Sequence, residues 1–469
     1  MSHVCVVGSG PAGLTLAEEL SRSGKINKIT ILEAGGDGQP FPEMSDFVSI
    51  GSTNYKPVRQ FMLGGHAHLW GGACPRLNPG DFSMKSQFGL YEDWPVSYTE
   101  LEEYYLKAEE YLSVTPSAQD DYLHTNQLNP ILSRAAKEER LGVLPYGNRR
   151  YFVDELLPKI KSSDVEVYTK SPVRNVNVKE DLIEVNYYNE TGDLNKLEAD
   201  CVVLACGGLS NARLLQMSNS GSFPLLGGPG DALGSFHMDH PRIQLTFIYE
   251  GELTENVLVK EGTLYDPEFA SIRKTVSNGD PTISYAAAHG QNSGSTTVLL
   301  DDIQRVILEV ESLESFELKI RNTVSYKSEI YLDIEVMEPP LKENKLTITT
   351  ENLDVFGDPM LATDININQT RDAIYNSIIS ELSSLFRPLG YRFTKLNNTG
   401  YTGQHPSGST RMSESADKGV VDKNLKVFGT KNLYVVGSSV FPTGGYANPT
   451  LTITALSIRL AEYLQRMYG

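Results

Sequence analysis

A glycine-rich motif near the start of the chain limits the folds that this sequence can adopt. The motif Gly8-Ser9-Gly10-Pro11-Ala12-Gly13 follows the apolar run Val4-Cys5-Val6-Val7, which is typical of a strand buried on both faces. The apolar spacing over 14–20 then predicts a helix, and Gly24 is a good residue for its C-terminal cap. Strand, glycine turn and helix in this order predict a Rossmann-type α/β unit that binds a dinucleotide.

The second strand of this unit supports the same reading. Ile29-Thr30-Ile31-Leu32 ends at Glu33, which is followed by Ala34 and lies about 20 residues after Gly13, the spacing at which an acid meets a ribose hydroxyl. The free N–H groups and partial positive charge at the helix start would face the phosphates. We therefore expect Gly8, Gly10, Pro11, Ala12, Gly13, Glu33 and Ala34 to bind the dinucleotide.

Bulk properties fit an enzyme with more than one part. A chain of 469 residues with 40% hydrophobic residues is expected to form two domains, or one domain with a large insertion. The net charge of −18 argues against nucleic acid or anionic membrane as a partner. No apolar run approaches the ~20 residues of a membrane span, and the first strand leaves no room for a signal peptide. The cysteines have no metal-type spacing, so we expect reduced thiols and a cytoplasmic protein.

A second glycine-rich segment follows the first strands. Gly64, Gly65, Gly71 and Gly72 flank His68, Leu69 and Trp70, a pattern that predicts backbone pressed against a flat ligand. A flexible surface loop is the alternative, and the apolar residues in the middle of the segment disfavour it.

Five further elements are expected before residue 240. Ser97 and Glu100 form a capping box for the helix that contains Leu101, Tyr104, Tyr105, Ala108 and Leu112. Strands are expected at 165–169 and 183–188. A buried strand from Cys201 ends at Ala205, Cys206, Gly207 and Gly208 and is followed by a helix, a repeat of the first unit.

The pattern changes between 240 and 400, where alternating strands predict an antiparallel sheet. The expected strands are 245–249, 297–300, 330–336 and 346–349, with helices over 306–315 and 370–388. We predict a nucleotide-binding domain over 1–240 with a possible lid at 115–160, a substrate domain over 241–400, and a return to the first domain over 401–469. The segment 433–437 is expected to add a last central strand.

The C-terminal block places two polar side chains on either side of that strand. His405 precedes it and Asn448 follows it, next to Pro449 and Thr450. The titratable imidazole is a candidate base, which would be brought to the dinucleotide from the opposite end of the chain. The alternative for His405 is a loop histidine that supports the turn at Gly408. The alternative for Asn448 is the N-cap of the last helix, with Pro449 in its first position.

Five segments together resemble the glucose–methanol–choline (GMC) family of FAD-dependent oxidoreductases. They are the N-terminal motif, the segment 64–72, Ala205 to Leu215, the pair of segments 344–347 and 354–359, and the block from His405 to Leu464. The C-terminal block looks most like the branch that holds pyranose oxidases and bacterial sugar or polyol dehydrogenases.

The resemblance implies FAD as the cofactor and assigns residues to it. It implies that the N-terminal glycines and Glu33 hold the ADP half and that the segment 64–72 runs along the isoalloxazine. It implies a catalytic pair of His405 and Asn448. It also implies cofactor contacts for Val173, Ala205, Cys206, Gly207, Gly437, Ser438, Asn448, Pro449 and Thr450.

One departure from the family bears on how FAD is held. Members that bond FAD covalently through the glycine segment carry a histidine directly before the tryptophan or asparagine, and here that residue is Leu69. We therefore expect non-covalent FAD, with attachment through His66 or His68 as the alternative.

The resulting hypothesis is the oxidation of a sugar, glycoside or polyol hydroxyl to a carbonyl. His405 would act as general base and the hydride would pass to flavin N5. Alternatives are a flavin-bound lyase of the same fold, oxidation of an apolar alcohol, a non-catalytic flavin subunit and an NAD enzyme. Oxygen, a quinone or a redox protein would take the electrons. The segment 237–240 has a metal-like look, but its loose spacing argues against a metal site, and the resemblance implies a structural or pocket-edge role for His240.

Overall fold

The fold was obtained as a computed structural model with full side chains. It describes residues 2–38, 45–50, 55, 57–58, 60–77, 79–88, 91–114, 141–143, 147–219, 226–250, 259–260, 263–264, 306–309, 317–326, 329–336, 338–365, 375–376, 379–380, 383, 387, 391–401, 405–445 and 447–469. The expected strand 297–300 and most of the expected helix 370–388 and of the possible lid lie outside the described residues.

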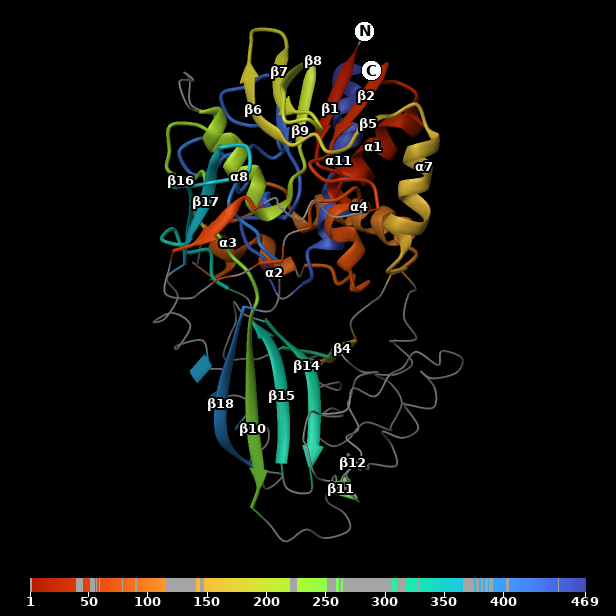
Figure 1. The fold of residues 1–469 in the computed structure, drawn as a ribbon. Coiled ribbons are helices and arrows are strands. Elements are labelled where there is room, and N and C mark those ends of the chain that lie inside the picture. Colours follow the sequence, from red (N-terminus) through yellow and green to blue (C-terminus); the bar gives the residue numbers. More distant parts are fainter. Residues whose placement is uncertain are drawn as a thin grey trace.

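The described chain is built around two main sheets (Figure 1). A five-stranded parallel sheet with helices beside it lies at the end that holds both termini, and a six-stranded antiparallel sheet lies at the other end. This α/β architecture, with an antiparallel part between two halves of a nucleotide-binding part, agrees with the sequence prediction. The antiparallel strand β10 begins at Pro241 and β18 ends at Tyr401. We keep 1–240, 241–400 and 401–469 as proposed domain boundaries.

The parallel sheet holds the N-terminal motif at its centre. Its strand order is β19-β9-β1-β2-β5, and β1 pairs with β2 and β9 in parallel register. The predicted last strand, β19, is fully buried but occupies an end of this order rather than a central place, because it pairs only with β9 among the described strands. The five strands are β1 His3–Val7, β2 Lys28–Leu32, β5 Glu166–Tyr168, β9 Cys201–Leu204 and β19 Leu433–Val435.

Helices cover the parallel sheet. The C-terminal helix α11 packs against both α1 and α4, so the two ends of the chain share one core. Gly24 ends α1 in the left-handed conformation, as predicted. The longer helices and turns are α1 Pro11–Ser23, α4 Tyr98–Tyr111, the π-helical turn η2 Tyr151–Leu156, α7 Leu157–Ser162, α8 Gly207–Ser218, and α11 Thr450–Tyr468. The short ones are η1 Gly65–Leu69, α2 Pro79–Phe82, α3 Met84–Phe88 and η4 Ser438–Val440.

The predicted capping box of α4 is half present. Ser97 Oγ accepts a hydrogen bond from the backbone N–H of Glu100 at 3.1 Å. The Glu100 carboxylate accepts instead from the Arg459 guanidinium of α11 at 3.0 Å. The glutamate therefore joins two helices rather than closing the cap.

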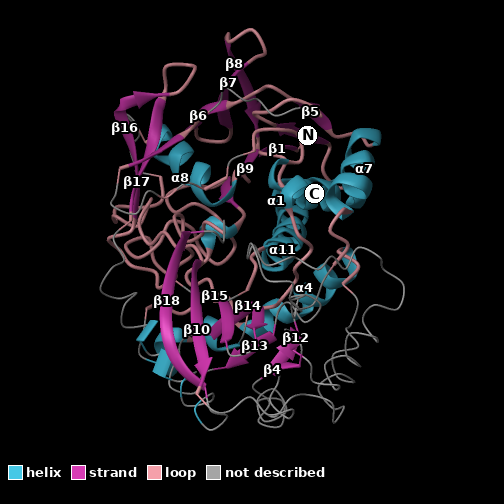
Figure 2. Cartoon of the chain, turned by 60° about the horizontal axis from the view of Figure 1, so that its bottom comes forward, coloured by secondary structure: helices cyan, strands magenta, loops and turns pink. Residues whose placement is uncertain are grey.

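The antiparallel sheet has the order β18-β10-β15-β14-β13-β4 (Figure 2). The predicted helix over 306–315 is wrong over its first turn, because Val306–Glu309 is strand β13, paired with β14 and β4. A stretch of alternating apolar residues fits either element, and the neighbouring strands decide it. The strands are β4 Leu141–Val143, β10 Pro241–Tyr249, β13 Val306–Glu309, β14 Glu317–Tyr326, β15 Glu329–Val336 and β18 Tyr391–Tyr401, with a separate pair β11 Val259–Lys260 and β12 Thr263–Leu264.

Two three-stranded sheets complete the described fold. The expected strand 346–349 is present within β16, but it belongs to one of these small sheets and not to the large antiparallel one. Helix α8 packs against β6, β16 and β17, which links both small sheets to the nucleotide-binding part. The strands are β3 Phe47–Ser49, β16 Lys345–Leu353 and β17 Pro359–Asp364 in one sheet, and β6 Val173–Val178, β7 Ile183–Tyr188 and β8 Leu194–Ala199 in the other.

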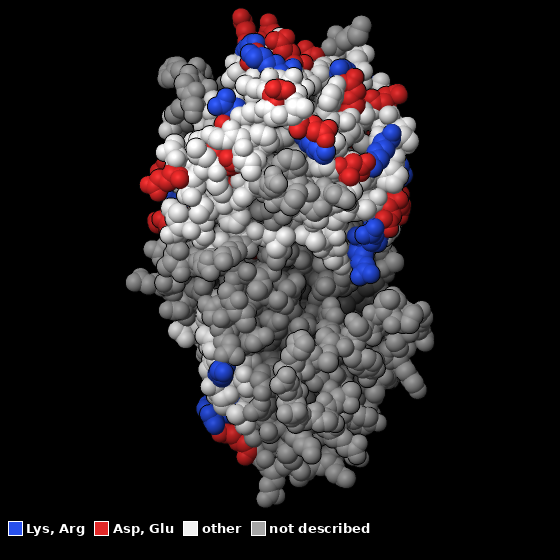
Figure 3. Space-filling view, in the orientation of Figure 1, with Lys and Arg blue, Asp and Glu red and all other residues white. Residues whose placement is uncertain are grey.

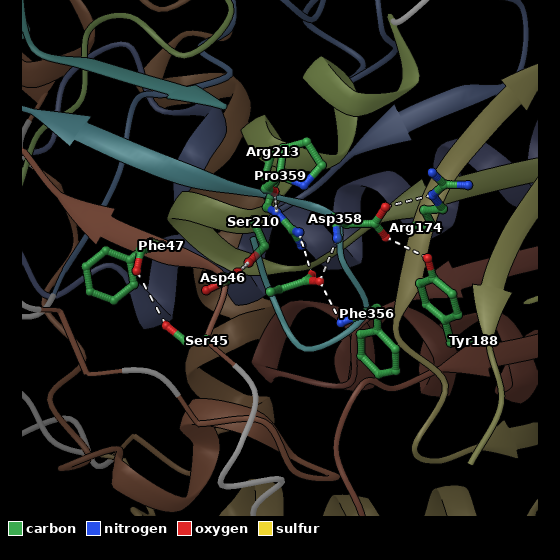
Figure 4. A network of polar contacts seen from close by, with 11 residues as sticks. Ser45, Asp46, Phe47, Arg174, Tyr188, Ser210, Arg213, Phe356, Asp358 and Pro359 are labelled. Atoms are coloured by element: carbon green, nitrogen blue, oxygen red, sulfur yellow. Dashed lines mark hydrogen bonds and ion pairs between the residues drawn. The ribbon is translucent and has the colours of Figure 1, made fainter. Parts of the chain in front are cut away.

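A polar network fastens the β16–β17 turn to α8 and β6 (Figure 4). Arg213 donates to Asp354 at 2.7 Å and to the carbonyl oxygen of Pro359 at 2.8 Å. Asp358 accepts from Arg174 and from the Tyr188 hydroxyl, each at 2.9 Å. These contacts hold the turn between β16 and β17 against α8 and against the sheet that contains β6.

Charged side chains of both signs are interspersed over the described part of the face in Figure 3. Among the described residues, no helix has the length and apolar character needed to cross a membrane.

Candidate active site

One cavity of about 470 Å³ runs from the end of β2 to the C-terminal block. Glu33 comes from the N-terminal part of the chain, and His405 and Asn448 come from the C-terminal part. All three line this cavity. This volume lies within the range of about 300–1,000 Å³ that is usual for small-molecule and cofactor sites. The predicted meeting of the two termini in one site is therefore present in the geometry.

The loop between β1 and α1 forms part of the wall because its glycines allow close packing. Gly8 has a φ of +97°, and a Cβ there would lie 2.7 Å from the carbonyl oxygen of Ala205. A Cβ on Gly10 would meet no protein atom within 4 Å, so this backbone borders open space. Pro11 occupies the start of α1, and no described side chain caps this helix. Its first turn can therefore receive an anion.

Glu33 is a buried carboxylate that fixes this loop. Its Oε2 accepts from the Ser9 backbone at 2.9 Å and from the Ser9 hydroxyl at 2.5 Å, while Oε1 accepts from the backbone of Gly35 at 2.8 Å. Burial raises the pKa of Glu33, and these hydrogen bonds oppose the shift. A carboxylate has further lone pairs, so these bonds leave room for a ribose hydroxyl.

The segment 64–72 contributes a short 3₁₀ helix and a tryptophan. Trp70 lines the cavity and packs edge-on against Phe152, with ring centroids 5.1 Å apart. Leu69 lines the cavity as well and is 53% exposed, which places it at the cavity's edge with solvent. A Cβ on Gly71 would meet no protein atom within 4 Å, so backbone borders the cavity here too.

The two histidines of this segment point in different directions. His66 lines the cavity, and its Nε2 lies 2.7 Å from the carbonyl oxygen of Val58. The ring of His68 turns back on its own segment, with Nε2 2.9 Å from the carbonyl oxygen of Leu63. His68 is therefore not part of the cavity wall.

The opposite wall comes from the end of β9 and the start of α8. Ala205, Cys206 and Gly207 line it, and a Cβ on Gly207 would meet no protein atom within 4 Å. The Cys206 backbone donates to Asn211 Oδ1 at 2.8 Å, and Asn211 Nδ2 donates to the Ser439 hydroxyl at 2.9 Å. The second strand–glycine–helix unit is thereby tied to the C-terminal block.

His405 and Asn448 are in direct contact at this cavity. Asn448 Nδ2 lies 3.1 Å from His405 Nε2, although the residues are 43 positions apart in the chain. The N-cap position of α11 is taken by Pro449, and no side-chain hydrogen bond caps this helix. Asn448 therefore does not cap this helix with its side chain, and its amide contacts His405.

A second histidine stands behind His405. His405 Nδ1 lies 3.1 Å from Nδ1 of His240, and the two rings meet edge to face at 77°. His240 is 4% exposed and follows Asp239, which accepts from the backbone N–H of both histidines through Oδ1. His405 is therefore held by a network and is not merely a support for the turn at Gly408.

Most of the residues predicted to bind the cofactor lie on the cavity wall, and four lie behind it. Gly13, Gly64, His68 and Gly72 are behind the wall, where the glycines allow close packing. On the wall are Gly8, Gly10, Pro11, Ala12, Glu33, Ala34, Gly65, Leu69, Trp70, Gly71, Val173, Ala205, Cys206, Gly207, Gly437, Ser438, Asn448, Pro449 and Thr450.

Sequence reasoning missed several wall residues that come from distant segments. Asp46, Ser210 and Arg213 line the cavity, and the Ser210 hydroxyl donates to Asp46. Ser210 and Arg213 lie one turn apart on the helix that follows Gly207, and this spacing was the signal that could have identified them. No comparable pattern marks Asp46.

The donor set fits FAD. Bare backbone at Gly10, Gly71 and Gly207 lets a large planar ligand approach, and an uncapped helix start and Glu33 lie at the dinucleotide end. No group of His, Cys, Asp and Glu side chains in the described segments is arranged to hold a metal ion.

Two family models and several known proteins are similar to this chain. Residues 386–457 match the family described as GMC oxidoreductase, and residues 3–234 match the family described as FAD dependent oxidoreductase. The fructose dehydrogenase large subunit of Gluconobacter japonicus is 22% identical, with 98% of this chain and 97% of the relative covered. The 2-methyl-1,2-propanediol dehydrogenase of Mycolicibacterium austroafricanum is 23% identical, with 100% and 96% covered.

A solved structure shares the fold. Pyridoxine 4-oxidase from Mesorbium loti superposes with a TM-score of 0.60 at 15% identity, with 99% of each chain covered. The two family matches lie at the two ends of the chain that build the cavity. The chain belongs to the GMC oxidoreductases and is an FAD-dependent oxidoreductase that acts on alcohol CH–OH groups.

Proposed function

We propose that this enzyme oxidises a hydroxyl group of a sugar, glycoside or polyol to a carbonyl, with His405 as the general base. The observation that carries the proposal is the contact of 3.1 Å between Asn448 Nδ2 and His405 Nε2 on the cavity wall. An aliphatic hydroxyl does not ionise alone near neutral pH, and a positioned imidazole typically contributes ~10²–10⁴ in rate.

The side chains divide the reaction between them. In the substrate complex the hydroxyl replaces the Asn448 amide as the partner of His405 Nε2, which takes the hydroxyl proton, and the Asn448 amide donates instead to the oxygen that loses it. FAD, when bound, accepts the hydride that leaves the carbinol carbon. The start of α11, at Pro449 and Thr450, borders the same end of the cavity and would hold the ring in place.

The substrate class is supported by chemistry and by likeness. Two relatives that align over the whole chain bear the names of a fructose dehydrogenase and a propanediol dehydrogenase. A polyhydroxylated substrate also suits a site whose catalytic end presents an imidazole and an amide. The pyranose-oxidase-like branch suggested by the C-terminal block is part of this proposal. We leave oxygen, a quinone and a redox protein as the candidate electron acceptors.

Anaerobic bleaching of the flavin tests the proposal. Sugars, glycosides, linear polyols and apolar alcohols of similar size are added to the yellow enzyme without oxygen. We expect bleaching by at least one hydroxylated class and recovery of colour when an acceptor is added. Bleaching by apolar alcohols alone contradicts the substrate class. Turnover of a substrate with no bleaching indicates the lyase.

We also propose that FAD is bound without a covalent link. The His68 ring is turned toward the Leu63 carbonyl and away from the cavity, and His66 Nε2 lies against the Val58 carbonyl. Acid precipitation should therefore release all yellow colour into the supernatant. Colour retained in the pellet, with a flavin-modified histidine peptide after digestion, would overturn this proposal.

A cytoplasmic location completes the proposal. The four cysteines, Cys5, Cys74, Cys201 and Cys206, are free thiols in the structure. Burial raises the pKa of Cys5 to about 12 and so makes this thiol unreactive. Fractionation of cells that produce the protein at natural levels tests the location. Recovery of the activity outside the cytoplasmic fraction would contradict it.

A further inference from the structure

His240 is a buried histidine that the proposed reaction does not use directly. Its Nδ1 faces His405 Nδ1 at 3.1 Å, and the ring centroids are 5.0 Å apart. Two neutral imidazole nitrogens at this distance form a hydrogen bond only if one of them carries a proton and the other does not. The contact therefore couples the tautomer of one ring to the tautomer of the other.

The backbone geometry keeps this contact in place. Asp239 Oδ1 accepts from the His405 backbone at 2.8 Å and from the His240 backbone at 2.7 Å. Asp239 Oδ2 accepts from the Tyr55 hydroxyl at 2.7 Å, and the Asp239 backbone donates to Glu338 at 2.9 Å. Asp239, Tyr55 and Glu338 are each 1% exposed. One buried carboxylate oxygen thus sets the spacing of the two histidines.

The opposite side of His405 selects the direction of the hydrogen bond. Asn448 Nδ2 is a donor, so His405 Nε2, at 3.1 Å, accepts with its lone pair. A neutral His405 whose Nε2 accepts a hydrogen bond carries its proton on Nδ1. That proton faces His240 Nδ1 at 3.1 Å, and its donation there leaves the proton of His240 on its Nε2.

We propose that His240 is a positioning residue that holds His405 in the tautomer with an unprotonated Nε2 facing the substrate. The proposal rests on the role of His405 proposed above. When Nε2 takes the hydroxyl proton, His405 becomes an imidazolium, and the lone pair of His240 Nδ1 still accepts from its Nδ1–H. No second proton moves, and His240 stays neutral through the reaction.

The consequence is a preorganised base. Without an acceptor behind it, His405 can place its proton on Nε2 and lose the ability to accept the substrate proton. Removing a partner that orients a metal-bound imidazole typically costs about 10- to 100-fold in affinity or activity, and we expect an effect of this order for His405. A histidine in the wrong tautomer can lose more than that.

Tautomers can be read directly by nitrogen NMR of the FAD-bound enzyme labelled with ¹⁵N-histidine. The chain has eight histidines, and the signals that disappear in His405→Ala assign this ring. We expect a protonated Nδ1 and an unprotonated Nε2 for His405 in the wild-type protein. A wild-type His405 that carries its proton on Nε2 overturns the proposal without any variant at position 240.

Two variants at position 240 extend the test. His240→Leu removes the acceptor, whereas the Asn oxygen of His240→Asn can take the place of Nδ1. We expect His240→Leu to move the proton of His405 to Nε2 and to slow flavin reduction roughly 10- to 100-fold, with substrate affinity changed less than about twofold. His240→Asn should restore most of the rate and the wild-type His405 signals. An unchanged tautomer in His240→Leu contradicts the proposal.

The test separates this proposal from the proposed function. If His405→Ala reduces its flavin at the wild-type rate, His405 is not the base and the proposed function fails. The tautomer of His405 in wild-type and His240→Leu protein still decides whether His240 fixes it.

Discussion

Gly13 lies directly beneath Gly8, so close that a Cβ on Gly13 would be 2.0 Å from the Gly8 carbonyl oxygen. The first turn of α1 can approach the end of β1 only because this side chain is absent. A Cβ on Gly10, three residues before Gly13, would meet no protein atom within 4 Å, and Gly10 borders the cavity. The three glycines of one motif thus have different tasks, packing at Gly8 and Gly13 and ligand approach at Gly10.

This difference predicts that an alanine at position 13 lowers stability, whereas an alanine at position 10 weakens FAD binding. Gly13→Ala forces the loop apart and should lower the free energy of unfolding of the FAD-free protein by about 2–3 kcal/mol. Gly10→Ala, at a φ of −68°, should change this free energy by less than about 0.5 kcal/mol but weaken FAD binding at least about tenfold. Urea unfolding and FAD titration measure the two effects. Wild-type FAD affinity in Gly10→Ala would contradict the assigned cavity face.

The His405–Asn448 contact predicts a second pair of effects. His405→Ala should slow flavin reduction by ~10²-fold or more in stopped-flow experiments while FAD stays bound. Asn448→Asp keeps the shape of the side chain but replaces the donor with an acceptor. It should favour a proton on His405 Nε2 and slow reduction roughly 10- to 100-fold. Reduction of either variant at the wild-type rate, with FAD bound, would contradict the base assignment.

The parts of the fold that could be predicted from the sequence are those with local patterns. The unit β1–loop–α1–β2 combines an apolar strand, glycines at fixed offsets and Glu33 within about 35 residues, so the local sequence determines it. The segment from Cys201 to Leu215 repeats this pattern, and the structure places both units against the same cavity.

The sequence-based predictions were wrong where pairing with neighbouring strands determines the secondary structure or the sheet. Val306–Glu309 forms a strand because β14 and β4 pair with it, and Leu346 joins a small sheet because β17 and β3 are its partners. An apolar stretch of this length has no period long enough to distinguish helix from strand. Leu433–Val435 is fully buried, but β9 covers only one edge of it, and Tyr434 also contacts Tyr463 of α11 and bridges to Lys426.

The candidate site also combines residues that a local pattern marks with residues that only long-range contacts bring together. His405 and Asn448 lie in a recognisable block, whereas the role of Asp239 and His240 depends on a bridge between Met238 and Ser407 that no local pattern indicates. Arg213 is a similar case, because its partners lie more than 140 residues away in the chain. Long-range contacts of single polar side chains carry no periodic signal in the sequence.

The ion pair of Arg213 with Asp354 predicts a large effect on stability. Its side chains are 6% and 3% exposed, so Asp354→Asn leaves a buried guanidinium without its counter-charge. We expect a loss of about 3–5 kcal/mol in the free energy of unfolding. Arg174, 43% exposed in its pair with Asp358, is the matched control, and Arg174→Gln should cost about 1 kcal/mol or less. Equal losses in the two variants, measured by urea unfolding, would contradict this ranking.

His237 predicts a dependence of stability on pH. The ring is fully buried, packs edge-on against Tyr55, and neither ring nitrogen has a hydrogen-bond partner among the described residues. Burial lowers the pKa of His237 to about 3, from an ordinary value near 6.5. Between these two values the unfolded chain binds a proton that the folded protein does not. The folded state therefore loses about 1.4 kcal/mol for each pH unit below 6.5.

His237→Phe keeps the ring packing and removes this proton linkage. The variant should match or exceed wild-type stability at pH 7.5, because two buried polar atoms without partners are removed. At pH 5.0 its advantage should be larger by about 2 kcal/mol, since the wild-type protein alone loses the His237 contribution. Urea unfolding of both FAD-free proteins at the two pH values measures the difference. An equal difference at pH 7.5 and pH 5.0 would show that His237 titrates normally in the folded protein.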